Sequence, residues 1–189
     1  MEWGTQIATL GGALIAISGT VLADRLRSRQ EVDRGSQTRR RELYLEFISA
    51  VGSAYTRLRE IAQDPGAVAD LEADSRAALT EAELYQVRER LFLEGDATVA
   101  AAGQAMFERL RDLRRAVATG AGPHSATFHD AYHPYIAAAW GYRVAVREEL
   151  EGTSLTPATF GLSAWDGRER CRDCRVGASD PGRPAGTPS

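Results

Sequence analysis

Lysine is absent from this sequence, so all 23 of its basic residues are arginine. Without a lysine the chain lacks the phosphate-binding residue of a P-loop, the nucleophile of a Schiff-base enzyme and the ATP-contacting residue of a protein kinase. Only two cysteines occur, Cys171 and Cys174, too few for the disulfide framework of a small secreted domain. These absences exclude several large classes of enzyme and of extracellular protein.

Other catalytic patterns are missing as well. No segment has the glycine spacing of a dinucleotide fold or a P-loop, and no glutamate is followed three residues later by the histidine that a di-iron bundle requires. The stretch around Ser163 lacks one glycine of a nucleophile elbow. No run alternates between apolar and polar residues, so we expect no sheet. The sequence favours an all-α protein that is not an enzyme and uses no cofactor.

The N-terminal segment has the length of a membrane span. Residues 3–23 carry no charged side chain, and a helix of this length rises by about 31 Å, close to the ~30 Å hydrocarbon core of a bilayer. Trp3 stands at one boundary, where an amphipathic ring is typical. Two alternatives are a signal peptide, for which a basic N-terminal region is lacking, and a helix buried in a soluble bundle. We predict a transmembrane helix within residues 1–23.

An arginine-rich segment, residues 24–41, follows this run and indicates its orientation. It contains seven arginines against three acidic residues. By the positive-inside rule the body that follows faces the cytoplasm and the N-terminus lies outside, in a single-pass protein of the inner (cell) membrane. We expect lipid headgroups as partners rather than nucleic acid, because neither aromatic side chains nor a recognition helix accompany the arginines. The predicted membrane-surface residues are Arg25, Arg27, Arg29, Arg39, Arg40 and Arg41.

Small residues recur at every fourth position of the predicted span, at Gly4, Ala8, Gly12 and Ala16. Such a stripe lets two membrane helices approach closely, so it predicts a homodimer that associates through this face. Because glycine, alanine, serine and threonine are abundant throughout the segment, a chance stripe is the alternative.

Residues 42–152 show helical periodicity almost throughout. Apolar residues fall at alternating spacings of three and four, and short breaks rich in glycine and proline separate four stretches of roughly 20 to 25 residues. This pattern predicts an antiparallel up-down bundle of about four helices. The expected core positions are Tyr44, Phe47, Val51, Ala54, Leu58, Ile61, Leu84, Val87, Leu91, Val99, Gly103, Met106, Leu110, Leu113, Val117, Tyr135, Ala139, Tyr142, Val146 and Leu150.

Several residues indicate where these helices begin and end. Thr80 and Glu83 have the spacing of a capping box and predict a break in the second stretch near residue 80. Asp96 is the expected N-cap of the third helix, and Gly152 is expected to close the fourth. Pro134 is expected in the first turn of that last helix, because a proline inside a helix costs ~3 kcal/mol.

From residue 153 onward the chain is poor in aliphatic residues and rich in glycine, proline, serine and arginine. Such a composition buries too little apolar surface to offset the entropy lost on ordering, above all in residues 177–189. We therefore predict that residues 153–189 form a flexible tail.

Cys171 and Cys174 form one C-x-x-C pair in this tail. A zinc site needs four ligands, and His129 with His133, one helical turn apart, would complete a set of two cysteines and two histidines. However, 37 residues separate the two pairs, which no compact zinc motif allows, and no strand precedes the cysteines as in a thioredoxin-like redox site. We interpret the cysteines as incidental and the histidines as structural, and we keep a metal or redox sensor as the alternative.

The sequence resembles a group of actinobacterial proteins of unknown function, the CchlQ-like proteins. The resemblance covers "GGALIAISGTVLADRLR" and "RRRELYLEFISAV" near the N-terminus and "YRVAVREEL" in the last predicted helix. It implies a membrane-anchored helical protein and supplies no activity or site residues.

Together these features predict a non-enzymatic, membrane-anchored helical module for protein–protein interaction or scaffolding. Its protein partner is not indicated by the sequence. The alternative is a soluble helical regulator in which residues 3–23 pack into the bundle.

Overall fold

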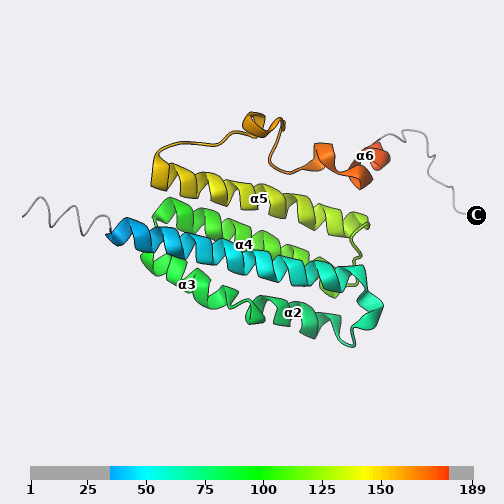
Figure 1. Ribbon diagram of the computed structural model, residues 1–189. Coiled ribbons are helices and arrows are strands. Elements are labelled where there is room, and N and C mark those ends of the chain that lie inside the picture. Colours follow the sequence, from blue (N-terminus) through cyan, green and yellow to red (C-terminus); the bar gives the residue numbers. More distant parts are fainter. Residues whose placement is uncertain (1–34, 179–189) are drawn as a thin grey trace, which may run out of the picture. The chain divides into compact units, whose positions relative to one another are not determined.

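The computed structural model describes residues 35–178, and within that range every regular element is a helix. The chain divides into two compact units, residues 1–41 and 42–189. The first described helix spans residues 35–63 and enters the second unit at residue 42. The other elements are η1 (Pro65–Ala67), α2 (Leu71–Glu81), α3 (Leu84–Glu94), α4 (Ala97–Ala118), α5 (Ala126–Glu151), η2 (Pro157–Phe160), η3 (Arg168–Arg170) and α6 (Arg172–Ala178) (Figure 1).

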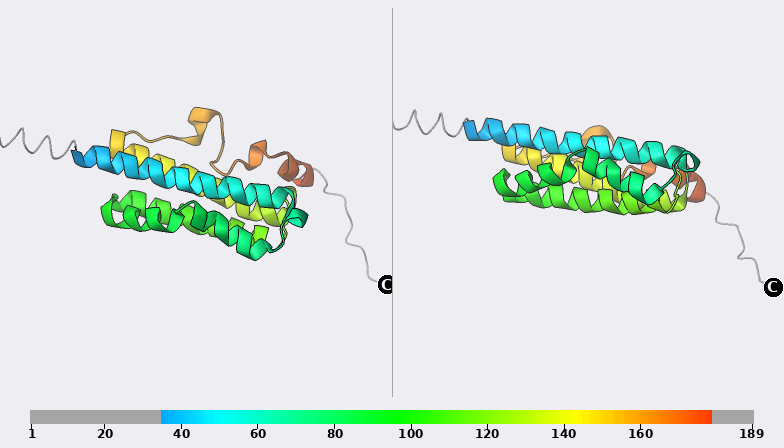
Figure 2. Two further views of the ribbon diagram at one scale, coloured as in Figure 1. Left: turned by 60° about the horizontal axis from the view of Figure 1, so that its bottom comes forward. Right: turned by 90° about the horizontal axis from the view of Figure 1, so that it is seen from below.

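Residues 42–152 form a helical bundle, as the apolar periodicity predicts. Residues 42–63, the consecutive pair α2 and α3, then α4 and α5 run in alternating directions (Figures 1 and 2). α4 packs chiefly against α5 and also contacts α2 and α3. The connections between these four segments are short, as is typical of an up-down bundle.

At one point in the bundle, one residue from each of four helices meets the others. Gly103 of α4 lies so close to Leu91 of α3 that an added Cβ would stand 2.5 Å from the Leu91 Cδ2 atom. The same Cβ would stand 3.3 Å from Phe47 and 3.4 Å from Tyr142 of α5. The rings of Phe47 and Tyr142 pack with centroids 5.2 Å apart, and the Tyr142 hydroxyl donates to the buried carbonyl of Tyr44 at 3.1 Å. A glycine is needed here because the four helices approach closely.

Asp96 is the N-cap of α4, as predicted. Its carboxylate accepts hydrogen bonds from the backbone N–H groups of Thr98 at 2.7 Å and Val99 at 3.4 Å. The Asp96 N–H in turn donates to the Tyr44 hydroxyl at 2.9 Å, which fixes the α3–α4 turn against the first described helix. This cap therefore joins a local signal to a tertiary contact.

The second helical stretch is broken near residue 80, as predicted, but the capping box was a wrong prediction. Glu83 adopts a left-handed conformation with φ 53° and makes no side-chain cap to α3. The Thr80 hydroxyl instead donates back to the carbonyl of Arg76 at 3.3 Å, within α2. The buried side chains of Leu79 and Leu84 hold the two short helices against the core across this break.

Pro134 lies well inside α5, so its predicted place in the first turn was wrong. The helix begins earlier because Ser125 caps it, its hydroxyl oxygen accepting from the Phe128 N–H at 3.2 Å. A proline at this position removes one helical hydrogen bond. Burial of the neighbouring His133 and Tyr135 side chains offsets that loss and keeps the segment helical. Gly152 closes α5 in a left-handed conformation, as predicted.

The C-terminal segment, residues 153–178, differs from the flexible tail that the sequence predicts. It contains η2, η3 and α6 and runs back along α5 (Figures 1 and 2). Trp165 stacks on Trp140 of α5 with ring centroids 4.5 Å apart, and Phe160 packs on the same tryptophan at 5.1 Å. These aromatic rings supply the apolar contact that the aliphatic-poor composition lacks.

Several predictions fall outside the described residues. These are the transmembrane helix within residues 1–23, its small-residue face, and the basic residues Arg25, Arg27 and Arg29. Arg39, Arg40 and Arg41 lie on the first described helix, where Arg39 and Arg41 are exposed. Within residues 35–178 no helix combines the length and the apolar character that a membrane crossing requires.

Candidate metal centre

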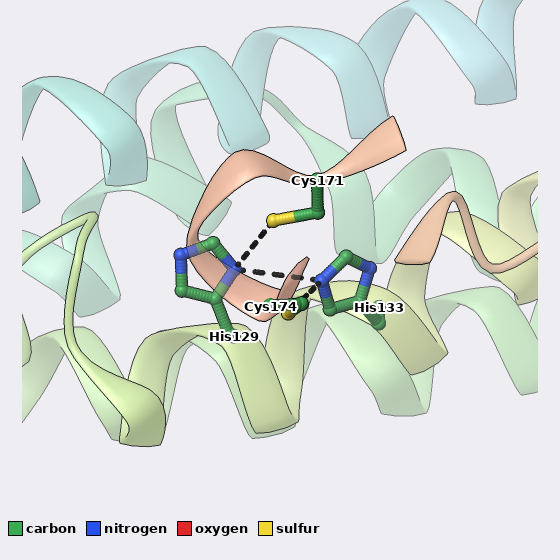
Figure 3. Close-up of side chains that lie close together, drawn as sticks. All are labelled: His129, His133, Cys171 and Cys174. Carbon is green, nitrogen blue, oxygen red and sulfur yellow. Dashed lines mark hydrogen bonds between the residues drawn. The ribbon is translucent and has the colours of Figure 1, made fainter. Parts of the chain in front are cut away.

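Two histidines of α5 and the two cysteines next to α6 converge on one point. His129 and His133 lie one turn apart on the face of α5 that the C-terminal segment covers, while Cys171 directly precedes α6 and Cys174 lies in its first turn. One ligand atom of each residue lies within 4.8 Å of the other three. Figure 3 shows the two rings and the two sulfurs turned toward one another.

Three of the six separations among these ligand atoms are close to those of a tetrahedral metal site, and the others are within 4.8 Å. His129 Nδ1 lies 3.4 Å from His133 Nε2 and 3.5 Å from the Cys171 sulfur, and His133 Nε2 lies 3.1 Å from the Cys174 sulfur. Around a zinc ion with ordinary bond lengths, ligand atoms stand about 3.3 Å apart for two nitrogens and about 3.6 Å for nitrogen and sulfur. A single zinc ion therefore fits among them with only small movements of the side chains.

The backbone of the C-terminal segment orients the His133 ring. Its Nδ1 lies 2.7 Å from the carbonyl oxygen of Asp166, which only accepts hydrogen bonds, so Nδ1 carries the proton and donates. In the neutral ring Nε2 then presents its lone pair to the centre. Because His133 is only 1% exposed, this orientation is held by packing as well as by the hydrogen bond.

Asp173 orients His129 in the same way. Its Oδ2 atom lies 3.2 Å from His129 Nε2 and 3.0 Å from Nδ1 of the exposed His124. The hydrogen bond from His124, with that from His129, holds the pKa of the Asp173 carboxyl below its ordinary value. The ionised carboxylate therefore accepts a hydrogen bond from the Nε2–H group of His129. His129 Nδ1 is thereby left with its lone pair toward the centre. A histidine ligand whose other nitrogen donates to a carboxylate or carbonyl is the usual outer shell of a zinc site.

These hydrogen bonds leave two ring nitrogens facing each other at 3.4 Å, each with a lone pair. The Cys174 thiol lies 3.1 Å from His133 Nε2 and the Cys171 thiol 3.5 Å from His129 Nδ1, so each nitrogen can accept from a thiol, and a bound metal ion would take the place of the two thiol protons. Desolvation by burial and the hydrogen bond that the Cys174 thiol donates to Cys171 raise the pKa of Cys174. A bound zinc ion reverses this shift, since a coordinated thiol is deprotonated. The centre thus offers two nitrogens and two sulfurs as ligands to a single metal ion.

Contacts within the C-terminal segment position the two cysteines. The Asp166 carboxylate accepts from the Arg168 N–H at 3.1 Å and turns the chain into η3. Glu169 accepts from the Ser163 N–H at 3.1 Å and from its hydroxyl, which closes the loop that carries Trp165. The pKa of the Glu169 carboxyl is accordingly lowered by these hydrogen bonds from Ser163. The loop therefore delivers Cys171 and Cys174 to α5 in a defined position.

Charged residues of α4 form a separate cluster, in which two of three arginines share one aspartate. A surface hollow of about 290 Å³ is lined by residues of α4 alone. Arg109 and Arg115 both pair with Asp112 there, at 3.2 and 2.6 Å. Because the Asp112 carboxylate pairs with both guanidinium groups, fewer arginine N–H donors in the hollow are available to bind an anion.

The four residues of the centre were all considered in the sequence, but their meeting was not predicted. From the sequence, the two cysteines are interpreted as incidental and the two histidines as structural. The structure instead brings Cys171, Cys174, His129 and His133 together. Asp166 and Asp173, which orient the rings, were not singled out. Asp173 stands inside the C-x-x-C pair, and this position was the one available signal for it.

No family model, no curated protein and no solved structure matches this chain.

Proposed function

We propose that this protein is a zinc-binding helical bundle in which His129, His133, Cys171 and Cys174 hold one ion. The observation that carries the proposal is the convergence of four ligand atoms within 4.8 Å, with both ring protons committed to oxygen acceptors outside the centre. Two nitrogens and two sulfurs as the ligand set favour zinc among the common metals.

The ligand set favours a structural role over a catalytic one. Catalytic zinc sites keep one position open for water or substrate, whereas four protein ligands fill the coordination sphere. The ligands come from α5 and from the C-terminal segment, 37 residues apart in the chain. Zinc bound there fastens residues 153–178 to the bundle, because the binding free energy of a structural ion becomes folding free energy of the part that it orders.

The zinc-fastened bundle is proposed to act as an interaction or scaffolding module at a membrane. The support for membrane anchoring is the uncharged run of residues 3–23 followed by the arginine-rich residues 24–41. In this arrangement the bundle lies in the cytoplasm, where reducing conditions keep thiols available for metal binding. Association of two copies through Gly4, Ala8, Gly12 and Ala16 belongs to the same proposal.

Zinc content tests the metal proposal. The full-length chain, purified without added metal chelators, is expected to hold one zinc ion, measured by elemental mass spectrometry against protein concentration. Replacing zinc by Co²⁺ is expected to give the strong visible bands of tetrahedral coordination and sulfur-to-cobalt charge transfer, because two sulfurs ligate the ion. Zinc content no higher than that of a Cys174→Ser variant contradicts the proposal.

Alkaline carbonate extraction tests the anchor. The full-length chain is expected to stay with the membrane pellet, since an apolar helix of residues 3–23 resists extraction. A chain that begins at residue 24 serves as its control and is expected in the supernatant. Release of both proteins alike contradicts a membrane span and favours the soluble alternative.

A further inference from the structure

The two cysteines lie on the partly exposed side of the metal centre, with His129, while His133 is buried. His133 is only 1% exposed, whereas His129, Cys171 and Cys174 are all partly exposed, and neither cysteine is in a disulfide. Dissolved oxidants therefore reach the sulfurs. Cysteine is also the ligand type that such oxidants attack, since the thiolate is a strong nucleophile.

The two cysteines are also placed to react with each other. Their sulfur atoms lie within 4.8 Å, and a spacing of three residues across the start of α6 brings the two Cβ atoms to about 5 to 6 Å. A disulfide needs Cβ atoms about 3.5 to 4.5 Å apart, so closing the bond requires only a small movement of a short terminal helix. C-x-x-C pairs form this bond in redox proteins.

We propose that the zinc centre reacts with hydroperoxides, which convert Cys171 and Cys174 to a disulfide, expel the zinc ion and release the C-terminal segment from α5. This inference rests on the proposed zinc binding. It adds to that proposal a class of reactant, the two-electron peroxide oxidants, and a consequence for the fold.

The reaction balances without a further reactant. With hydrogen peroxide, one thiolate attacks a peroxide oxygen and becomes a sulfenic acid, while the other oxygen leaves as hydroxide; an organic hydroperoxide loses an alkoxide instead. The second thiolate attacks the sulfenic sulfur, forms the S–S bond and displaces a second hydroxide. Two electrons pass from the sulfurs to the peroxide, and two protons from solvent convert the hydroxides to water. The zinc ion leaves as Zn²⁺ because both of its sulfur ligands are gone.

Loss of zinc removes the bonds through which Cys171 and Cys174 are joined to α5. His129 and His133 alone offer two nitrogens, half of a structural set. The remaining polar links to α5 are the hydrogen bonds of Asp173 with His129 and of Asp166 with His133. The stacked pair Trp140 and Trp165 then reports the release, because separation of rings 4.5 Å apart changes their fluorescence.

The test treats the full-length, zinc-loaded chain with hydrogen peroxide and follows zinc with a chromophoric chelator. Trypsin cleaves after Arg172, between the two cysteines, so the disulfide keeps the peptides on either side joined in a mass spectrum. We expect one zinc ion released for each disulfide formed, a change in tryptophan fluorescence, and rebinding of zinc after dithiothreitol. A Cys171→His variant keeps four ligand side chains with one sulfur, so its zinc is expected to survive the same treatment.

Three results overturn the inference. The inference is wrong if zinc stays bound at peroxide doses that oxidise a free thiol. It is also wrong if zinc is released but no Cys171–Cys174 disulfide forms. In both cases the zinc proposal itself stands. A chain that binds no zinc before peroxide is added instead overturns the zinc proposal, and this inference with it.

Discussion

Replacement of His133 by alanine is expected to weaken zinc binding by roughly 100-fold or more and to free residues 153–178 while the bundle stays folded. A structural zinc ion is held by about 10 to 16 kcal/mol, so each of four ligands contributes about 2.5 to 4 kcal/mol on average. Once the ion is lost, trypsin is expected to cut at the arginines of η3 and α6. Competition with a chelator of known zinc affinity measures the first effect and timed proteolysis the second.

Two further variants make this result specific. His124→Ala is a matched histidine replacement, because His124 is 85% exposed and reaches Asp173 without facing the centre. Its effect is expected to stay within the 10- to 100-fold range of outer-shell changes and below that of His133→Ala. Cys174→Ser changes one atom and disturbs packing least, so it is expected to reproduce the loss of zinc with unchanged helix content. Equal zinc affinity of the His133→Ala variant and the parent chain would contradict the proposed zinc site.

The bundle was predictable from sequence because its signals are local. Phe47 and Tyr142 belong to apolar series with helical spacing, and burial of both was expected and is found. Asp96 was predicted as an N-cap because the short acidic side chain stands at the junction of two periodic stretches. Pro134 was misplaced for the opposite reason. Its local preference for a helix start is outweighed by the packing of the residues around it.

The metal centre was not predictable because its formation depends on a reversal of the chain. His129 and His133 share one helix face by spacing alone, and Cys171 and Cys174 are a pair by spacing alone. What joins them is the return of the C-terminal segment along α5, which the stacking of Trp165 on Trp140 stabilises. A contact between distant aromatic residues leaves no periodic pattern in the sequence. Residues 153–178 were therefore predicted from their composition, which is typical of a flexible tail.

The histidine pair and the cysteine pair are nevertheless recognisable in the sequence. The chain has two cysteines and three histidines, and four of these five residues fall in two pairs with helical spacing. Phe160 and Trp165 are large aromatic residues in a stretch otherwise poor in apolar side chains. Taken together, these observations indicate that residues 153–178 pack against another part of the protein. Composition alone does not indicate this.

The last prediction concerns the bundle that carries the centre. Phe47→Ala is expected to lower the free energy of unfolding by about 3 to 5 kcal/mol. Phe47 is fully buried, its ring packs on Tyr142, and it borders the close approach of Gly103 and Leu91. Because four helical elements meet there, the truncated side chain leaves a cavity that no single helix fills by shifting. A loss of that size corresponds to a fall of roughly 6 to 20 °C in melting temperature for a chain of this length.

Leu45→Ala is the matched control, since Leu45 lies two residues away on the same helix and is 60% exposed. Its effect is expected within about 0.5 kcal/mol. Calorimetry of the zinc-loaded chain gives both melting temperatures, and zinc affinity at a temperature where Phe47→Ala is folded gives a second reading. That affinity is expected to be unchanged, because Phe47 has no contact with the four ligands and changes at separate sites act independently. Equal melting temperatures for the two variants would refute the packing of four helices at Gly103.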